Sequence, residues 1–165
     1  MASFYALSLW LHILSVALWI GSMLFFLIVF GPAVHSLSPG TGVRVLDQGR
    51  QRFERLSWIA IGFLLFTGIL NLVAHAMTSG SPPGVGYYSV LGIKLVLFLA
   101  MIFHHCLQAF KYGSKMTALT AEAPEELESW PEPLLSHWKK WFMLLKINAT
   151  LGTILLFLGL ALSRI

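Results

Sequence analysis

Four long apolar stretches dominate the chain, and short polar segments separate them. The stretches cover residues 4–30, 56–77, 88–110 and 141–162. Each has at least the roughly 20 residues that an α-helix needs to cross the hydrocarbon layer of a membrane. Their apolar residues are continuous rather than alternating, which argues against membrane β-strands. The pattern predicts an all-α integral membrane four-helix bundle with up-down-up-down topology, built as one domain from residues 1–165.

Composition supports lipid as the surroundings of most of this chain. Of the 165 residues, 57% are hydrophobic and 11% are charged, against roughly 45–50% and 25% in an average soluble protein. The single cysteine excludes a disulfide framework and a multi-cysteine zinc site. No nucleic-acid-binding motif accompanies the net charge of +4, so we expect membrane lipid and no nucleic acid as partner.

The placement of the basic residues predicts how the chain crosses the membrane. They gather in the first and third connections, whereas the second connection, 78–87, has no Lys or Arg. The residues concerned are Arg44, Arg50, Arg52, Arg55, Lys111, Lys115, Lys139 and Lys140. By the positive-inside rule these two connections are cytoplasmic and both termini lie outside. The acidic cytoplasmic loop 113–138 is then a short surface helix, a loop that docks a soluble partner, or a solvated linker.

A few ionisable side chains interrupt the apolar stretches, where such groups are costly and often mark a functional site. With alternating helix directions, His12, His75 and Lys94 fall toward the outer side of the membrane. His104 and His105 fall in the cytoplasmic half. At 100° per residue, His105 shares a helix face with Lys94, while His104 points about 80° away. We therefore expect His105 to face the bundle interior.

Histidines from different helices commonly hold haem b inside membrane bundles. The candidate metal ligands here are His12, His75 and His105, and Lys94 joins them as a candidate cofactor-binding residue. The spacing permits an axial pair of His12 with His75, or of His12 with Lys94. Other roles stay open: His75 as an interfacial residue, Lys94 as a side chain reaching to the membrane surface, and the histidines as partners in interhelical hydrogen bonds.

Several short motifs resemble a known group of membrane proteins. The segment Leu11-His-Ile-Leu-Ser-Val-Ala-Leu-Trp-Ile-Gly21 is similar to the first helix of the CopD copper-resistance family and of the related HemJ-type protoporphyrinogen oxidases. Arg52-Phe53, Thr67-Gly68, Gly92-Ile-Lys-Leu95 and His105 follow in the same order and spacing. The resemblance covers essentially all four helices.

The resemblance implies two kinds of chemistry. In HemJ-type proteins a histidine of the first helix and a lysine of the third are linked to haem b and activity, and these correspond to His12 and Lys94. CopD proteins are associated with copper uptake across the inner membrane, for which histidine and methionine are suitable ligands. The chain departs from both: it has a long acidic loop before the fourth helix, no arginine late in the first helix, and no Met-rich outer loop.

The leading expectation is a haem b protein of the cell inner (plasma) membrane that takes part in electron transfer. It would work with a quinone or as a small subunit among other membrane redox subunits of a respiratory complex. A porphyrin-precursor oxidase is its enzymatic variant, and whether the chain is an enzyme stays open. One alternative is copper uptake through a relay of His12, His75, Met77 and Met101. Another is a structural anchoring subunit that docks a soluble partner at 113–138.

Overall fold

The computed structural model describes residues 2–78, 84–124 and 126–162, and the side chains of residues 5–77, 84–124 and 126–162. Every regular element within these ranges is helical. In chain order the elements are α1 (Ala2–Phe25), the π-helical turn η1 (Phe26–Phe30), α2 (Gly31–His35), α3 (Pro39–Thr78), α4 (Val85–Cys106), the π-helical segment η2 (Leu107–Gly113), α5 (Ser114–Glu122) and α6 (Glu132–Leu162).

These elements form four long helices. The residues that join α1 to η1 and η1 to α2 keep right-handed helical dihedral angles, and so do those that join α4, η2 and α5. Four helices, Tyr5–His35, Pro39–Met77, Val85–Glu122 and Glu132–Leu162, are long and apolar enough to cross a membrane. The prediction of an all-helical chain with four membrane-spanning segments is confirmed at this level. By the length and composition of its helices, the chain is a multi-pass membrane protein.

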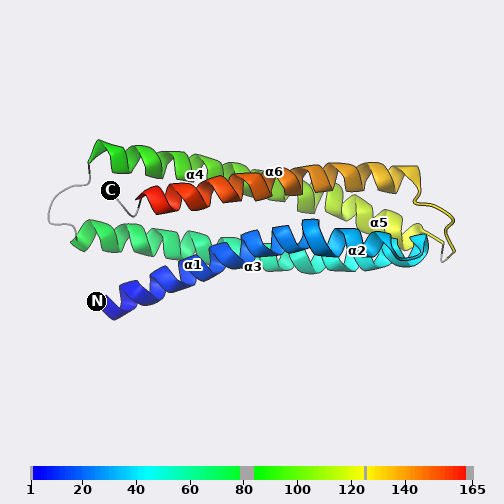
Figure 1. The fold of residues 1–165 in the computed structure, drawn as a ribbon, viewed down its shortest axis with the longest axis horizontal. Coiled ribbons are helices and arrows are strands. Elements are labelled where there is room, and N and C mark those ends of the chain that lie inside the picture. Colours follow the sequence, from blue (N-terminus) through cyan, green and yellow to red (C-terminus); the bar gives the residue numbers. More distant parts are fainter. Residues whose placement is uncertain (1, 79–83, 125, 163–165) are drawn as a thin grey trace.

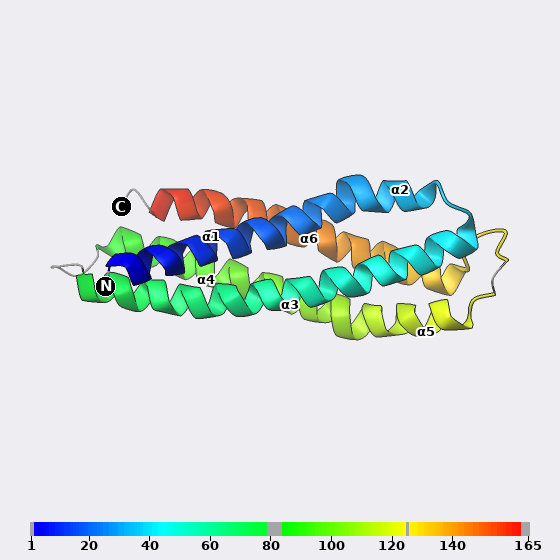
Figure 2. The same ribbon diagram turned by 90° about the horizontal axis from the view of Figure 1, so that it is seen from below.

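The helices lie side by side as two antiparallel pairs. α1 packs against α3, and α4 packs against α6, while α1 with α6 and α3 with α5 connect the pairs. Both described chain ends lie at one end of the bundle, which we call the terminus end (Figures 1 and 2). The connections at residues 36–38 and 123–131 lie at the opposite end, which we call the loop end.

The helices extend well beyond the predicted membrane segments at the loop end. α3 begins at Pro39 instead of residue 56, so the first basic connection is mostly helix. The expected cytoplasmic loop 113–138 is also mostly helix, and only 123–131 connect α5 with α6. Proline at the start of a helix needs no amide hydrogen, which suits Pro39 as the first residue of α3. Polar helical segments outside lipid lack the continuous apolar pattern on which the prediction rested.

Two hydrogen bonds place three helices at a common level along the bundle. Trp141 Nε1 donates to Glu54 Oε1 at 3.2 Å, and Gln108 Nε2 donates to the Trp141 carbonyl at 3.1 Å. From Glu54, α3 continues about 36 Å to Thr78 and about 22 Å to Pro39, at 1.5 Å of rise per residue. The bundle is therefore much longer than the roughly 30 Å hydrocarbon layer.

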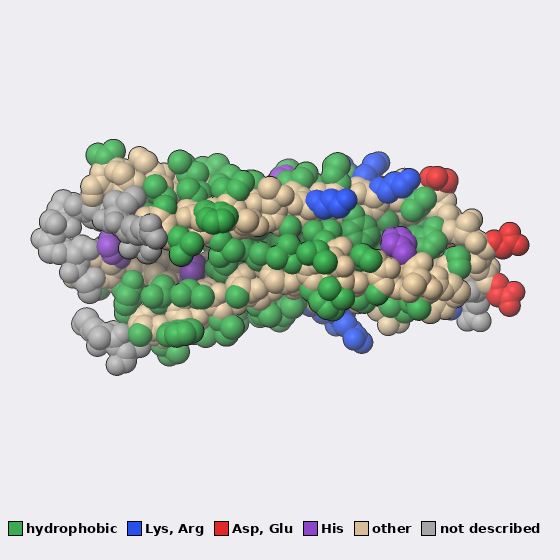
Figure 3. All heavy atoms as spheres, in the orientation of Figure 1, with side chains coloured by type: hydrophobic (Ala, Val, Ile, Leu, Met, Phe, Trp, Pro, Cys, Tyr) green, Lys and Arg blue, Asp and Glu red, His purple; other side chains and the backbone are tan. Residues whose placement is uncertain are grey.

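Exposed cations gather near the level of Glu54. Within about 5 Å of it along the helix axes lie Arg52, Arg55, Lys111, Lys139 and Lys140. On the face shown in Figure 3, Lys and Arg side chains occupy the half nearer the loop end, and Asp and Glu side chains stand at that tip.

The hydrophobic core fills only part of the bundle. Trp19, Met23, Phe26, Trp138 and Trp141 are at most 3% exposed and belong to one cluster that continues into the loop end. Toward the terminus end, the last buried apolar side chains of the described residues are Leu64 on α3 and Ala149 on α6. Beyond them the buried side chains are the polar Ser8 and Thr67. Among the residues whose side chains are described, none that is apolar is fully buried in the terminal third of the bundle.

Candidate functional site

His12 of α1 is held by Thr67 of α3, its neighbour in the first helix pair. The distance from His12 Nδ1 to Thr67 Oγ1 is 2.8 Å. The Thr67 hydroxyl donates its single hydrogen to the Phe63 carbonyl at 2.6 Å. The hydroxyl oxygen must therefore accept the hydrogen of His12 Nδ1. In a neutral ring this leaves the lone pair on Nε2, the nitrogen available to a ligand or a proton.

Two buried oxygens without a partner lie one helical turn from this pair, toward the terminus end. Ser8 precedes His12 by four residues, and Asn71 follows Thr67 by four, so they extend the same two helix faces. Ser8 Oγ and Asn71 Oδ1 make no hydrogen bond within the described residues. Buried polar atoms usually have a partner, so these two favour a polar group or water beside His12.

Lys94 of α4 brings a second nitrogen to this region from the other helix pair. Its side chain is half-buried, and its Nζ lies beside α6, 3.6 Å from where a β-carbon of Gly159 would stand. Lys94 and His12 are close enough for their charges to interact. Histidine side chains come to the surface between the two pairs at the terminus end (Figure 3). Of the residues predicted for a site, His12 and Lys94 both lie toward the terminus end of the bundle, on different helix pairs.

His75 does not join His12 at this level. Its ring stacks on Tyr87, with centroids 4.8 Å apart and planes at 16°. It follows Thr67 by eight residues, which is about 12 Å along α3. Two nitrogens that bind one metal ion from opposite sides lie about 4 Å apart, because each metal–nitrogen bond is about 2 Å long. In this arrangement His12 and His75 cannot bind one metal ion together.

His105 lies deeper, on the loop-end side of His12. It is fully buried, as its helical spacing predicted, and its ring is near those of Trp19, Phe53 and Trp58. Trp19 follows His12 by seven residues, or about 10 Å along α1. Neither His105 nitrogen has a hydrogen-bond partner within the described residues.

His104 points elsewhere, and its Nδ1 lies 3.2 Å from Asn148 Oδ1 of α6. Asn148 in turn donates to the Met101 carbonyl at 3.2 Å. This contact gives His104 an interhelical structural role between α4 and α6.

The candidate metal ligands therefore stand at three levels along the bundle. Within the part of the chain that the structure describes, no group of three or more His, Cys, Asp and Glu residues could hold a metal ion. His12, His75 and His105 do not form a single site, and any metal centre at His12 needs a ligand of another kind.

A buried charge network at the level of the cations was not predicted. Arg50 is only 2% exposed, and its guanidinium contacts Asp47 Oδ1 and Glu54 Oε2, each at 2.7 Å. It also donates to Thr117 Oγ1 of α5 at 2.5 Å. The sequence had placed Arg50 in a solvated connection. The sequence did contain one indication of this network. Arg50 is three residues from Asp47 and four from Glu54, and residues at these spacings share one helix face.

Gly113 gives this network its space, and replacing it tests the packing. A β-carbon there would lie 2.5 Å from Arg50 Nη1 and 2.9 Å from Glu54 Oε1. We expect Gly113→Ala to lower the free energy of unfolding by about 1–3 kcal/mol, the usual effect of overpacking. Titration with sodium dodecyl sulfate, followed by circular dichroism, measures it.

Gly92→Ala is the matched control, since a β-carbon at Gly92 meets nothing within 4 Å. The control should be neutral or slightly stabilising, because alanine favours the helix over glycine. Equal stability of Gly113→Ala and the wild type would contradict the close packing around Arg50.

Comparisons of this chain with protein-family models, curated proteins and solved structures found no match. The resemblance to CopD and HemJ-type proteins thus stays a prediction from short motifs.

Proposed function

We propose that this chain is a haem b protein of a membrane, with His12 and Lys94 as the two iron ligands, and that it serves membrane electron transfer. The observation that carries the proposal is the fixed ring of His12. Its Nε2 lone pair is available in the terminal third of the bundle, within electrostatic range of Lys94 from the other helix pair.

The residues present fit a b-type haem. His12 of α1 and Lys94 of α4 would hold such a group through an imidazole and an amine nitrogen from different helices. The amine would do so as its free base. Ser8 Oγ and Asn71 Oδ1 offer unused hydrogen-bonding capacity to polar substituents at the same place.

Each of these residues has a distinct task. Thr67 orients the His12 ring and keeps the hydrogen on Nδ1, as the second hydrogen bond of a ligating histidine does. Lys94 supplies the second nitrogen, and its position beside Gly159 keeps it near α6. When bound, haem supplies one-electron redox chemistry, while the protein sets ligation and burial.

The proposed placement in the membrane follows from two groups of residues that are typical of membrane surfaces. The exposed cations near Glu54 mark one surface, and Tyr87 and Tyr88, beside His75, mark the other. Glu54 and His75 are 21 positions apart on α3, about 31 Å along the helix axis, which matches the roughly 30 Å hydrocarbon layer. The loop end then projects from the cationic surface. By the positive-inside rule that surface is cytoplasmic and the termini are outside.

The residues of the alternative copper relay do not share a level. Met77 is 77% exposed near the terminus end, whereas Met101 is 1% exposed in the core. The separation of His75 and His105 from His12 further weakens a copper path through these residues. Haem would need only two nitrogen ligands, and His12 and Lys94 both lie toward the terminus end of the bundle.

An absorption spectrum tests the proposal. Protein purified from haem-replete cells should show a b-type reduced-minus-oxidised difference spectrum, and His12→Ala should lose most of its amplitude per protein. His75→Ala is the matched control and should keep the spectrum, because His75 stands about 12 Å away along the bundle. A colourless wild-type protein, or an unchanged spectrum in His12→Ala, would overturn the proposal.

A further inference from the structure

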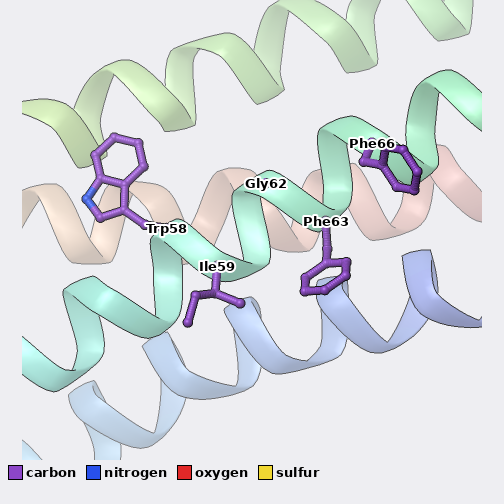
Figure 4. A pocket seen from close by; sticks show the side chains of 5 residues that line it. All are labelled: Trp58, Ile59, Gly62, Phe63 and Phe66. Atoms are coloured by element: carbon purple, nitrogen blue, oxygen red, sulfur yellow. The ribbon is translucent and has the colours of Figure 1, made fainter.

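A shallow apolar groove runs along the outer surface of α3. Trp58, Ile59, Gly62, Phe63 and Phe66 line it, and all five are exposed. Figure 4 shows Gly62 between Trp58 and Phe66 on one side and Ile59 and Phe63 on the other. A β-carbon at Gly62 would meet nothing within 4 Å, so the groove exists because this residue has no side chain.

Arg55 stands at the loop-end mouth of this groove. It precedes Gly62 by seven residues, which places the two within about 20° on the helix surface. Arg52 lies one turn further toward the loop end. Both arginines are exposed, and neither makes an ion pair with any residue that the structure describes.

A third cation, Lys111, lies at the same level on the neighbouring helix, with its Nζ 5.6 Å from the centre of the Tyr112 ring. Phe110 of η2 has its ring 5.8 Å from that of Trp58, and Lys111 follows it directly. The mouth of the groove is therefore cationic, and its walls are aromatic and aliphatic over about 12 Å of helix.

These features match one kind of molecule. In the proposed membrane placement, Arg55 lies at the depth of the lipid headgroups, and the groove continues from it into the hydrocarbon layer. An anionic headgroup would meet the cations, and an acyl chain below it would lie over Gly62. A zwitterionic lipid offers the same chain without the net negative charge.

We propose that the α3 groove is a binding site for an anionic phospholipid, with Arg55 and its neighbours Arg52 and Lys111 at the headgroup and Gly62 under an acyl chain. The inference rests on the proposed membrane placement and not on haem. A colourless protein would therefore leave it standing.

Brominated lipids test the site through Trp58. The full chain is reconstituted in phosphatidylcholine vesicles that contain brominated phosphatidylglycerol or brominated phosphatidylcholine at the same mole fraction. The Trp58 signal is the difference between the wild type and Trp58→Phe, because the chain has six tryptophans. We expect the anionic lipid to quench Trp58 with higher apparent affinity than the zwitterionic lipid.

Two variants separate the headgroup from the acyl chain. Each cation near a membrane surface strengthens binding of anionic lipid roughly five-fold, so Arg55→Gln should reduce the preference by about that factor. Gly62→Leu fills the groove and should also remove most of the preference. Each variant is measured against its own Trp58→Phe partner.

Matched controls come from other helices. Lys139→Gln removes an exposed cation at the same level on α6, and Gly92→Leu adds a side chain at an open glycine of α4. Both should keep the wild-type preference. Equal quenching by the two lipids in the wild type, or an unchanged preference in Arg55→Gln, would overturn the site. Trp58 shielded from both lipids would indicate a protein helix in the groove instead.

Discussion

Replacing Arg50 with methionine should lower the free energy of unfolding by about 3–5 kcal/mol, the cost of removing one partner from a buried ion pair. The arginine holds Asp47, which is 5% exposed, and Glu54, whose side chain is 13% exposed. Without it, two carboxylates remain side by side with no positive charge between them. Sodium dodecyl sulfate titration of the purified protein, followed by circular dichroism, measures the loss.

Two further variants isolate the cause. Arg52→Met removes a neighbouring but exposed arginine and should change stability by less than about 0.5 kcal/mol. If Arg50→Met yields no folded protein, the triple change Asp47→Leu, Arg50→Met and Glu54→Leu should restore folding, because apolar groups can replace a whole buried ionic cluster. An Arg50→Met protein as stable as the wild type would show that the cluster contributes nothing to folding.

The second large effect concerns Thr67 and its contact with His12. Thr67→Val keeps the shape of the side chain but removes the oxygen that accepts the His12 hydrogen. Removing the hydrogen-bond partner that orients a metal-binding histidine typically weakens metal binding about 10- to 100-fold. We therefore expect the haem content after purification and the affinity for added haem to fall by that factor, with the midpoint potential of the remaining haem shifted.

The conservative replacement distinguishes orientation from packing. Thr67→Ser retains the hydroxyl and should recover most of the haem affinity, whereas valine retains only the volume. The far-ultraviolet circular dichroism of both variants should match that of the wild type. Equal haem affinity in the valine and serine variants would show that the hydrogen bond does not position His12.

The helices are longer than the apolar segments, which shows where the local hydropathy pattern no longer predicts the structure. Residues 39–55 carry many charges, so they resemble a solvated connection when hydropathy alone is considered. In the structure they form the first part of α3, and Arg50 is buried there. Its partner Thr117 is 67 positions away, and Trp141, which donates to Glu54, is 87 positions from that glutamate. The ion pairs of Arg50 with Asp47 and Glu54 lie within one short stretch of sequence, whereas the contacts with Thr117 and Trp141 do not.

In the candidate site too, the sequence predicts some features and the packing of the helices decides others. The sequence placed His12 and Lys94 toward the same side of the membrane, because depth follows from position along a helix of constant rise. It left His75 and Lys94 as equal partners for His12. The packing of the helix pairs adds one distinction, since His75 lies about 12 Å further along α3 than Thr67, the hydrogen-bond partner of His12.

The sequence by itself therefore determined the four membrane-spanning helices and the inward face of His105, since hydropathy and helical period are properties of consecutive residues. The tertiary structure alone decided the helical loop end, the burial of Arg50 and the hydrogen bond of His12 with Thr67. Each of these depends on which helices lie side by side. That choice is set by side-chain packing between segments far apart in the chain.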